Sequence, residues 1–302
     1  MRLFGKTNID FMAKRRMWYS VSATVIVVGL FSVVFKGLHL GVDFRGGTEL
    51  VVQFEHSVPI GEVRDAMERA GFARAEIKTF GADNLILIRT TEQAEEAAIA
   101  DRIKAGLNSS FPQIAHTVVK EDRIGPKIGA ELRRDAVYAV IASLIVILGY
   151  MAMRFKFVYG VGAVVALFHD VLVTLGAISI LDGLLGYLNL EIDQNMIAAF
   201  LTLIGFSVND TVVIFDRIRE NLKIYRSMSL IEVINRSVND TLSRTIITSG
   251  TVFLVLAVLL IFGGEVNRGF AFAMLIGIVT GVYSTIYIAS AIVIDWTARA
   301  KK

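Results

Sequence analysis

The sequence predicts an α-helical polytopic membrane protein with six membrane-spanning helices and an α+β domain between the first two of them. Hydrophobic residues make up 54% of the chain, whereas soluble domains average about 45–50%. Six apolar runs each come near the length of about 20 residues that crosses a bilayer. A stretch of soluble composition, residues 37–134, separates the first run from the second.

A short polar segment precedes the first apolar run. Residues 1–16 end in Lys14-Arg15-Arg16, and residues 17–36 form the first predicted span. A signal peptide has a shorter apolar core and a small-residue cleavage site. No Ala-x-Ala sequence follows this run, so we expect an uncleaved first helix.

Residues 37–134 alternate strand-like and helix-like patterns. Pro59 stands near the first position of a predicted helix that stops at Gly71, and Gly81-Ala82-Asp83 is a predicted turn. Strands are predicted at 48–54, 73–80, 84–90 and 114–121, and helices at 59–70 and 91–107, the second one capped by Thr91. This β-α-β-β-α-β order predicts a ferredoxin-like domain.

Five further spans follow the soluble stretch and form one membrane region, residues 135–295. They are predicted at 136–153, 157–181, 196–215, 245–262 and 270–294, followed by a short tail at 296–302.

The positions of Lys and Arg predict the orientation in the bilayer. Four segments carry most of them outside the soluble stretch, namely residues 1–16, 154–156, 216–244 and the tail. The two loops that would lie opposite, 182–195 and 263–268, carry only Arg268. By the positive-inside rule both termini are cytoplasmic and the ferredoxin-like domain is extracytoplasmic.

Asp210 and Asn209 lie within the fourth predicted span. A carboxylate at hydrocarbon depth costs about 2.5–3.5 kcal/mol on insertion scales and usually marks an ion or proton path. The alternative is a hydrogen bond to a neighbouring helix, which contributes about 0.6 kcal/mol on average. Arg217 is one heptad further on the same face, about 10 Å away along the axis, which is too far for a direct ion pair but within reach of a water-linked path.

Two other sites carry polar groups inside predicted spans. His169 and Asp170 lie near the middle of the third span, where a proton relay and a packing hydrogen bond are equally good interpretations. Because they are adjacent, they cannot share one helix face, and we expect one of them to face the core more squarely than the other. Arg244, at the start of the fifth span, is either a cytoplasmic anchor or a counter-charge for Asp210.

Small and hydroxylated residues in the spans predict close packing. Gly205 in the fourth span and the pair Gly277 and Gly281 in the sixth allow helices to approach closely. Hydroxyl groups either line a wet cavity or bond within the helices. They are Thr248, Ser249 and Thr251 in the fifth span and Tyr283, Ser284 and Thr285 in the sixth.

The sequence excludes several classes of function. It contains no cysteine, no phosphate-binding loop of the Gly-x-x-x-x-Gly-Lys type and no metal-ligand spacing. The net charge is only +3 and no basic cluster is arranged for nucleic acid. We therefore expect no enzyme activity, metal or cofactor, and we expect energy to come from an ion gradient.

Four motifs together resemble a known family. They are Gly41-Val-Asp-Phe-Arg-Gly-Gly-Thr48, Ile124-Gly-Pro-Lys-Ile-Gly129, the segment from Gly205 to Asn221, and the segment from Arg244 to Thr251. Their order and spacing resemble the SecD/SecF protein-export family over essentially the full length. The first motif contains the family signature Asp43, Phe44, Arg45, Gly46 and Gly47.

The resemblance implies a multi-pass protein of the bacterial inner membrane whose membrane half is similar to resistance-nodulation-division transporters. It implies SecD as a partner subunit, the SecYEG translocon and emerging unfolded secretory polypeptides as further partners, and YajC and YidC as additional candidates. Protons would be the coupling ion, passing through Asp210 and Arg244. Those transporters commonly carry paired aspartates where this chain has Asn209-Asp210.

Two alternative functions remain open at this stage. A small-molecule or lipid exporter would use the same membrane half, although the outer stretch holds one ferredoxin-like unit and no second module. A scaffold that stabilises a larger translocon would make Asp210 a purely structural residue.

Overall fold

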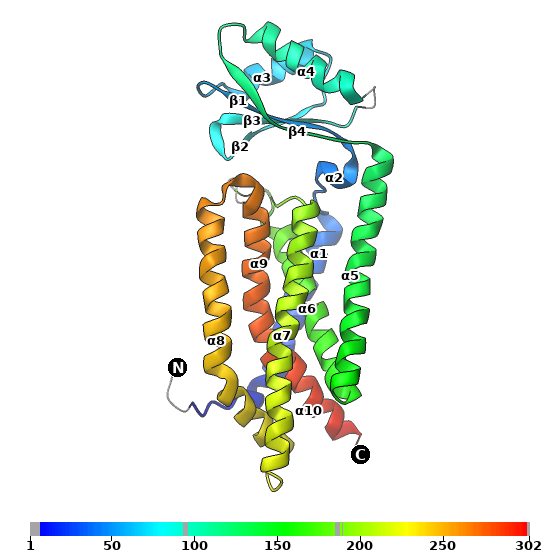
Figure 1. Ribbon diagram of the computed structural model, residues 1–302, viewed down its shortest axis with the longest axis vertical. Helices are drawn as coiled ribbons and strands as arrows, with labels where there is room; N and C mark the ends of the chain where they lie inside the picture. The colour runs from blue at the N-terminus through cyan, green and yellow to red at the C-terminus, as the bar shows by residue number, and fades with distance from the viewer. Residues whose placement is uncertain (1–6, 93–95, 185–187, 189, 301–302) are drawn as a thin grey trace. The chain divides into compact units, whose positions relative to one another are not determined.

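The computed structural model describes residues 7–92, 96–184, 188 and 190–300. The chain divides into two compact units. The sheet unit comprises His39–Val137 and Glu191–Gln194. The membrane unit comprises Met1–Leu38, Tyr138–Leu190 and Asn195–Lys302, as far as these residues are described (Figure 1). The predicted fold class, a polytopic helical protein with one inserted α+β domain, is confirmed.

The sheet unit has the predicted ferredoxin-like topology. Its four described strands form one antiparallel sheet in the order β2-β3-β1-β4. The elements are α2 (Val42–Arg45), β1 (Gly47–Phe54), α3 (Ile60–Arg69), β2 (Glu76–Phe80), β3 (Ala82–Thr90), α4 (Glu96–Ser110) and β4 (His116–Ile124).

Alternate residues of the central strands form the core of this unit. They pack against the apolar stripes of α3 and α4, which follow the helical period. The fully buried core residues include Leu50, Val52 and Phe54 of β1, Ile86 and Ile88 of β3, Val63 and Met67 of α3, and Ile103 and Leu107 of α4.

Several predicted boundaries in this unit were wrong. Thr91 does not cap α4, because Thr91 and Glu92 are not helical and the Glu92 amide donates to the Thr90 hydroxyl instead. β4 continues past Glu121 to Ile124, because β1 pairs with it down to Gly47. The hairpin is tighter than predicted, since only Gly81, with φ +81°, lies outside the two strands.

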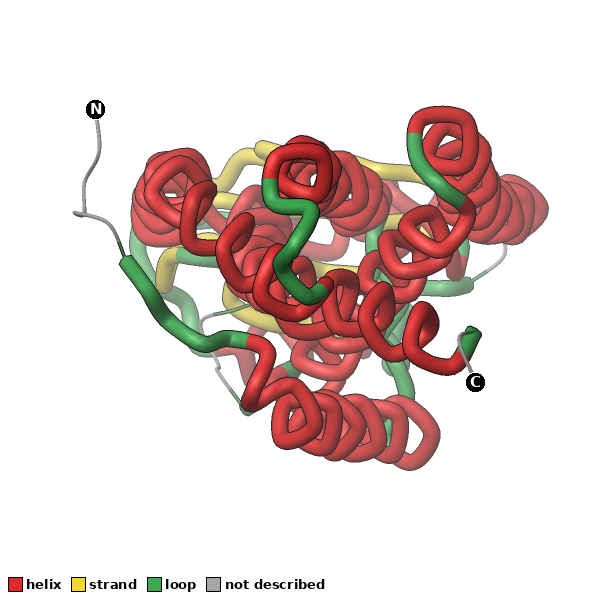
Figure 2. The backbone as a smooth tube through the Cα atoms, turned by 90° about the horizontal axis from the view of Figure 1, so that it is seen from below, coloured by secondary structure: helices red, strands yellow, loops and turns green. Residues whose placement is uncertain are grey.

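The membrane unit is built from long helices, seen end-on in Figure 2. Six helices of the described chain are long and apolar enough to cross a membrane. They are α1 (Arg15–Phe35), α5 (Pro126–Arg154), α6 (Phe157–Leu181), α7 (Gln194–Ile224), α8 (Leu230–Phe262), and α9 (Gly264–Ser284), which continues through the π-helical turn η2 (Thr285–Ala289) into α10 (Ser290–Arg299). A short 3₁₀ turn, η1 (Met12–Lys14), precedes α1.

Most of these helices are longer than the apolar runs that predicted them. α5 begins at Pro126 inside the sheet unit, before the predicted start at residue 136. The predicted cytoplasmic stretch 216–244 is largely helical, because α7 runs to Ile224 and α8 starts at Leu230. A capping box between Ser229 and Glu232 fixes that start.

Glycines set the closest contacts between these helices. Gly29 of α1 and Gly176 of α6 meet backbone to backbone, and a Cβ on Gly176 would lie 2.7 Å from the Gly29 Cα. Gly277 of α9 leaves no room for a Cβ beside Leu203 of α7, which confirms the predicted packing face. Gly205 does not serve this purpose here, because it is exposed and no other described group lies within 4 Å of its Cβ position.

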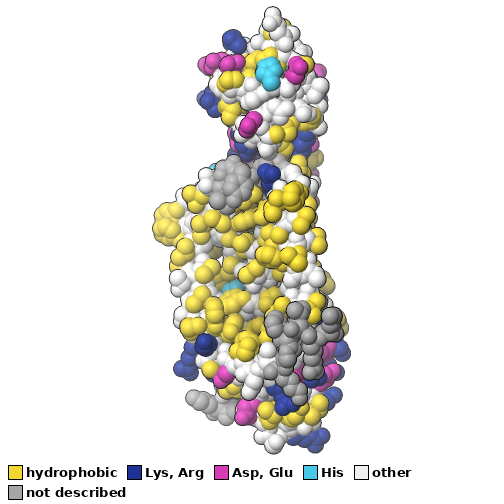
Figure 3. Space-filling model, turned by 90° about the vertical axis from the view of Figure 1, so that its left-hand side faces the viewer, with side chains coloured by type: hydrophobic (Ala, Val, Ile, Leu, Met, Phe, Trp, Pro, Cys, Tyr) yellow, Lys and Arg dark blue, Asp and Glu magenta, His cyan; other side chains and the backbone are white. Residues whose placement is uncertain are grey.

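The surface of the membrane unit is apolar along the helices. On the face seen in Figure 3, hydrophobic side chains cover much of the membrane unit, and charged side chains gather at the end where α1 begins. Val34, Met153 and Phe262 are each at least 75% exposed. In water such a surface would be an aggregation liability, whereas in a bilayer it is the expected lipid-facing and partner-facing surface.

Candidate functional site

Asp210 is buried in the middle of α7, with 4% of its surface exposed. Its side chain points toward α8, where the Ser249 hydroxyl donates a 3.1 Å hydrogen bond to Oδ2. Arg244 stands on the same helix, five residues before Ser249, and its side chain is exposed. The hydrogen bond between Ser249 and Asp210 therefore joins α8 to α7 at a buried carboxyl group.

Asp170 is the second buried carboxyl group of the unit, and it is more fully bonded than Asp210. Ser207 of α7 donates to its Oδ2 over 2.7 Å, and Ser284 of α9 donates to the same oxygen over 2.9 Å. The other oxygen lies 3.0 Å from Nδ1 of His169. Asp170 thus ties α6 to both α7 and α9.

His169 extends this network to α1. Its Nε2 lies 3.1 Å from the Ser22 hydroxyl, which also bonds the Tyr283 hydroxyl. Tyr283 in turn bonds the Trp18 carbonyl over 2.9 Å. Both His169 and Asp170 are at least 95% buried, so the expected difference between them in facing the core is small. Helices α1 and α9 both pack along α6 and so enclose both side chains.

The two carboxyl groups are linked through α7. Ser207, which bonds Asp170, stands three residues before Asp210, so both project from one side of the helix. Within the described chain, no direct hydrogen bond joins the two carboxyl groups. The buried hydroxyls of Thr174 and Thr245 have no hydrogen-bond partner among the described residues. Thr174 lies one helical turn from Asp170, and Thr245 lies one turn from Ser249.

The structure does not bring every predicted site residue to Asp210. Asn209 is exposed on another face of α7, and the Arg244 side chain is also exposed. Arg217 bonds Asp240 of α8 over 2.8 and 3.0 Å and pairs with Glu220, so its charge is already neutralised away from Asp210. The water-linked path predicted from Arg217 has no support in this geometry.

The hydroxyl groups of the fifth and sixth predicted spans behave differently from one another. Thr248 and Thr251 donate to carbonyls of their own helix, as isolated hydroxyls in helices commonly do. Ser249 alone turns to Asp210. In the other helix Thr285 lies 3.0 Å from the Thr211 hydroxyl of α7, so this cluster joins helices.

A π-helical turn beside the site was not predicted. It spans Thr285–Ala289, and the Ser290 hydroxyl bonds the Thr285 carbonyl five residues back. Single π-turns of this kind are frequent at functional sites. The only sequence signal was the run Tyr283-Ser284-Thr285, which indicates polar contacts but not a change in helix pitch.

The family signature lies in the sheet unit and makes structural contacts there. The Asp43 carboxylate accepts a 2.9 Å hydrogen bond from the backbone N–H of Gln194. Phe44 is buried and Arg45 is exposed. Gly46 and Gly47 have φ values of +75° and +135°, which only glycine adopts without strain.

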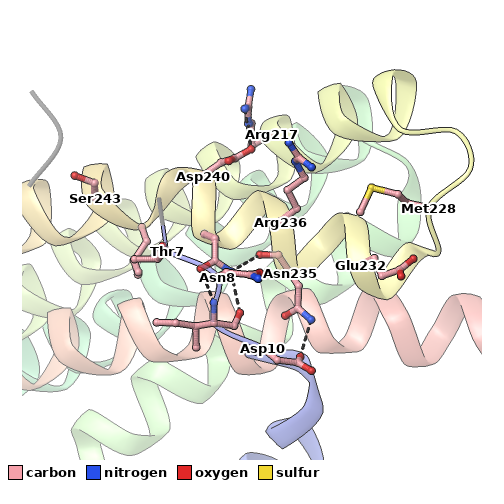
Figure 4. Close-up of a pocket in the computed structure, with 13 residues that line it drawn as sticks. Thr7, Asn8, Asp10, Arg217, Met228, Glu232, Asn235, Arg236, Asp240 and Ser243 are labelled. Atoms are coloured by element: carbon pink, nitrogen blue, oxygen red, sulfur yellow. Dashed lines mark hydrogen bonds and ion pairs between the residues drawn. The ribbon is translucent and has the colours of Figure 1, made fainter. Parts of the chain in front are cut away.

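A polar pocket lies where the N-terminal segment crosses α8 (Figure 4). Asn239 bonds both backbone groups of Ile9, over 2.9 and 2.8 Å. Asn235 accepts from the Met12 N–H and donates to Asp10 over 2.6 Å. The two asparagines clamp this segment onto the helix. In the described residues no group of three or more His, Asp or Glu side chains is placed to hold a metal ion.

Comparison with known proteins decides the family. The model of the family described as "Protein export membrane protein SecD/SecF, C-terminal" matches residues 103–299, and that of the "SecD/SecF GG Motif" matches residues 31–58. The chain belongs to the SecD/SecF family. As a SecD/SecF protein it has a role in protein export, and its six apolar helices make it a multi-pass membrane protein.

Relatives within the SecD/SecF family match the chain over almost its whole length. A "Protein translocase subunit SecF" from Rhodothermus marinus is 46% identical over 99% of this chain and 97% of the relative. The same subunit from Thermodesulfovibrio yellowstonii is 42% identical over 97% of this chain and 96% of the relative.

Two solved structures share the fold. The crystal structure of SecDF from Thermus thermophilus superposes with a TM-score of 0.83 at 37% identity, covering 97% of this chain. SecDF in its "Super-membrane-facing form" superposes with a TM-score of 0.72 at 36% identity, covering all of this chain. The chain spans only 39% and 40% of the lengths of these two SecDF chains.

Proposed function

We propose that this chain is the SecF-type subunit of a two-subunit machine that uses the proton-motive force to assist protein export across the bacterial inner membrane. Its relatives of equal length are named SecF, and the solved chains that contain its fold are named SecDF. Those longer chains support SecD as the partner that supplies the rest. The coupling ion is the proton, and the chain carries no enzyme activity of its own.

The observation that carries this proposal is that, among the described residues, one side chain, Ser249, hydrogen-bonds the buried carboxyl group of Asp210. A carboxylate only accepts hydrogen bonds, whereas a protonated carboxyl also donates one. Gain or loss of a proton at Asp210 therefore changes what Ser249 can do, and with it the contact between α7 and α8.

Asp170 has a different role in this proposal. Two serines and His169 already satisfy its oxygens, so a change of protonation there would break bonds to several helices at once. The His169–Asp170 pair therefore fixes the packing of α6 against its neighbours. Asp210, with one described hydrogen-bond partner, is the group left free to exchange a proton.

The exposed polar groups of α7 and α8 support a partner on that face. Asn209 and Arg244 are exposed in this chain although they lie within or beside predicted spans. Polar side chains at such positions normally face another protein or a wet cavity rather than lipid. We place the SecD subunit there. SecYEG, YajC, YidC, the unfolded secretory polypeptide and the cytoplasmic location of both termini belong to the same proposal.

The test is export of a secreted precursor into inverted membrane vesicles, with and without a proton gradient, with the chain assembled with SecD. Asp210→Asn is compared with Asp216→Asn, which makes the same chemical change on the same helix at a surface ion pair with Arg154. We expect Asp210→Asn alone to lose the gradient-dependent part of export and to keep the rest. Retention of gradient-dependent export by both variants would make Asp210 structural and the chain a scaffold.

A further inference from the structure

Helix α8 carries a row of buried hydroxyl groups. Its members stand four residues apart, so they follow one another along one face of the helix. They are Ser237, Thr241, Thr245 and Ser249, and we call them the hydroxyl row. Each of the four residues is at most 8% exposed. Because a buried hydroxyl group without a hydrogen bond costs free energy, a row of them at this depth calls for partners.

Both ends of the hydroxyl row contact α7. At one end the Ser249 hydroxyl donates to the Asp210 carboxyl group over 3.1 Å. At the other end the side-chain amide of Asn221 donates to the Ser237 hydroxyl over 3.0 Å. These two contacts are about 18 Å apart along α8 at 1.5 Å per residue. The row therefore leads from the buried carboxyl group toward the end of α7.

The middle of the hydroxyl row contains an unpaired group. The Thr245 hydroxyl has no hydrogen-bond partner among the described residues, although Thr245 is only 2% exposed. Thr241 instead donates to the Ser237 carbonyl over 2.9 Å, which is the usual solution for a threonine in a helix. Ile214 and Ile218 of α7 lie between the two contacts with the row and cannot hydrogen-bond. Protein groups therefore leave the Thr245 hydroxyl unsatisfied.

The outer end of the hydroxyl row reaches a pocket. The side-chain oxygen of Asn221 is a second buried group without a partner among the described residues. The amide of the same side chain also donates to Asp240 over 3.2 Å, and Asp240 pairs with Arg217. Asp240 and Arg217 line the polar pocket of Figure 4, and their side chains are 31% and 39% exposed. The row thus connects unpaired buried groups to a site that solvent reaches.

The spacing of the hydroxyl row suits water. Residues four apart on a helix have Cβ atoms about 5–6 Å apart. A water molecule that bonds two hydroxyl groups spans about 5.5 Å, which is twice the usual O–H···O distance of about 2.7–2.8 Å. One water can therefore bridge each pair of neighbours in the row. Buried waters in proteins typically make about three hydrogen bonds to groups that are otherwise unpaired.

We infer that the hydroxyl row binds a single file of water molecules that connects Asp210 to the pocket at Asp240. The file pairs with the Thr245 hydroxyl and with the side-chain oxygen of Asn221. It passes a proton by exchange, since each water accepts one proton on its oxygen and releases another to the next member, so that no hydroxyl group is consumed. This route follows α8, unlike the path along α7 that the sequence predicted from Arg217. Its role in proton supply rests on the proposed function, whereas the bound water does not.

Cysteine accessibility tests the bound water without reference to proton coupling. The chain has no native cysteine, so Thr245→Cys places a lone thiol on the hydroxyl row. Val238→Cys is the control, because Val238 is 1% exposed in the apolar core of the membrane unit and lies on the same helix. Silver ion, which travels through water and binds thiolates, is added to the full chain assembled with SecD. Thiols that remain free are labelled with a maleimide after unfolding.

We expect silver to protect Thr245→Cys from later labelling several times faster than it protects Val238→Cys. Such a difference requires water at the hydroxyl row, since both sites are equally covered by protein. Equal rates of protection at the two sites would overturn the inference.

Export into vesicles tests the proton route, with SecD present. Thr245→Val removes the hydroxyl with little change in volume, Thr245→Ser keeps it, and Thr248→Val removes a hydroxyl that bonds carbonyls of its own helix. We expect Thr245→Val to lose most of the gradient-dependent part of export and to keep the rest, which shows that it assembles. The other two variants should keep both parts. Gradient-dependent export by Thr245→Val at the level of Thr248→Val would overturn the route.

The two assays separate failure of the route from failure of the proposed function. Retention of gradient-dependent export by Asp210→Asn would refute the proposed function, while the silver rates would still decide the bound water. Loss in Asp210→Asn, together with native export by Thr245→Val, would refute only the proton route.

Discussion

The Ser249 hydroxyl of α8 lies 3.1 Å from Oδ2 of Asp210 of α7 and donates a hydrogen bond to it. This is the one side-chain hydrogen bond described for that carboxyl group. It also distinguishes Ser249 from its neighbours Thr248 and Thr251, which bond carbonyls of their own helix. Of these three hydroxyl groups, the one that bonds Asp210 is therefore that of Ser249.

Ser249→Ala should lower gradient-dependent export while costing little stability. Interhelical hydrogen bonds in membranes contribute about 0.6 kcal/mol on average, so the helices should still assemble with SecD. Thr251→Ala is the matched control, because it removes a hydroxyl from the same helix without touching Asp210. Export into vesicles with and without a gradient measures both. A gradient-dependent deficit of equal size in the control would contradict the role of Ser249.

Asp170→Ala should destabilise the membrane unit by about 2 kcal/mol, because Ser207, Ser284 and His169 all lose a partner. Asp170→Asn keeps one acceptor oxygen and should lose about half as much. Thermal unfolding of the full chain in detergent measures the difference, with Asp135→Ala at an exposed ion pair as control.

The same pair of variants separates packing from proton transfer at Asp170. An amide cannot carry a proton between sites, yet it can hold the two serines in place. We expect Asp170→Asn to retain gradient-dependent export. Its loss in a variant that unfolds normally would show that Asp170 is part of the relay.

Gly176→Ala should destabilise the contact between α1 and α6 by about 1–3 kcal/mol, the usual range for overpacking. The added methyl group would meet the Gly29 backbone, which cannot turn away as a side chain can. Gly149→Ala on α5 is the control, since no other described group lies within 4 Å of its Cβ position. It should be neutral or stabilising, because alanine favours helix. Thermal unfolding of both variants in detergent is the measurement.

Local signals in the sequence predicted part of this architecture. Asp210 was predicted as a site because a carboxylate inside an apolar run is unusual. That signal lies within one short stretch of sequence, so no knowledge of distant contacts is needed to see it. The Gly277 and Gly281 spacing likewise marked a packing face that the structure confirms. Helix ends were predicted poorly, because hydropathy detects the apolar part of a helix and not its polar continuation. The capping box at Ser229 and Glu232 was a usable signal for the true start of α8.

Contacts between distant segments could not be predicted from one sequence. Asp43 and Gln194 are 151 residues apart in the chain, and the sequence around neither residue indicates that the two are hydrogen-bonded. The partners of Asp170 come from two further helices, so their convergence depends on how all three pack. Asn209 was grouped with Asp210 because they are adjacent, although neighbouring helical residues point about 100° apart. That rotation places Asn209 on the exposed face.

Acid should loosen the sheet unit through Glu191. Burial opposes ionisation of this carboxyl group, but hydrogen bonding and charge from Arg89, with further support from Lys78, outweigh it and lower the pKa from about 4.5 to about 2. A lowered pKa in the folded state stabilises the fold above the unfolded value, and this contribution is lost as the pH falls from about 4.5 to 2. At 1.36 kcal/mol per pKa unit it amounts to about 3 kcal/mol.

Glu191→Gln should lower stability at neutral pH and flatten this acid dependence. Unfolding of the full chain in detergent across the pH range, with hydrogen exchange followed in β3, measures it. Glu62→Gln, at an exposed carboxylate of α3, is the control and should follow the native curve. An unchanged acid profile in Glu191→Gln would show that other carboxylates carry the effect.

Asn239→Ala should release the N-terminal segment from α8. Asn239 holds both the N–H and the carbonyl of Ile9, and no aliphatic side chain can replace either bond. Each hydrogen bond contributes about 1 kcal/mol net, so the Ile9 amide should exchange roughly thirtyfold faster.

Asn235, labelled beside Asp10 in Figure 4, still holds the Met12 N–H, which should limit the release to the residues before it. Asn267→Ala removes an asparagine whose described hydrogen bond goes to the Gly263 carbonyl next to its own helix, and it should leave Ile9 exchange unchanged. Hydrogen exchange read residue by residue compares the three chains. Unaltered protection of Ile9 in Asn239→Ala would mean that the segment is held by other contacts, such as burial of Phe11 and Met12 in the core of the membrane unit.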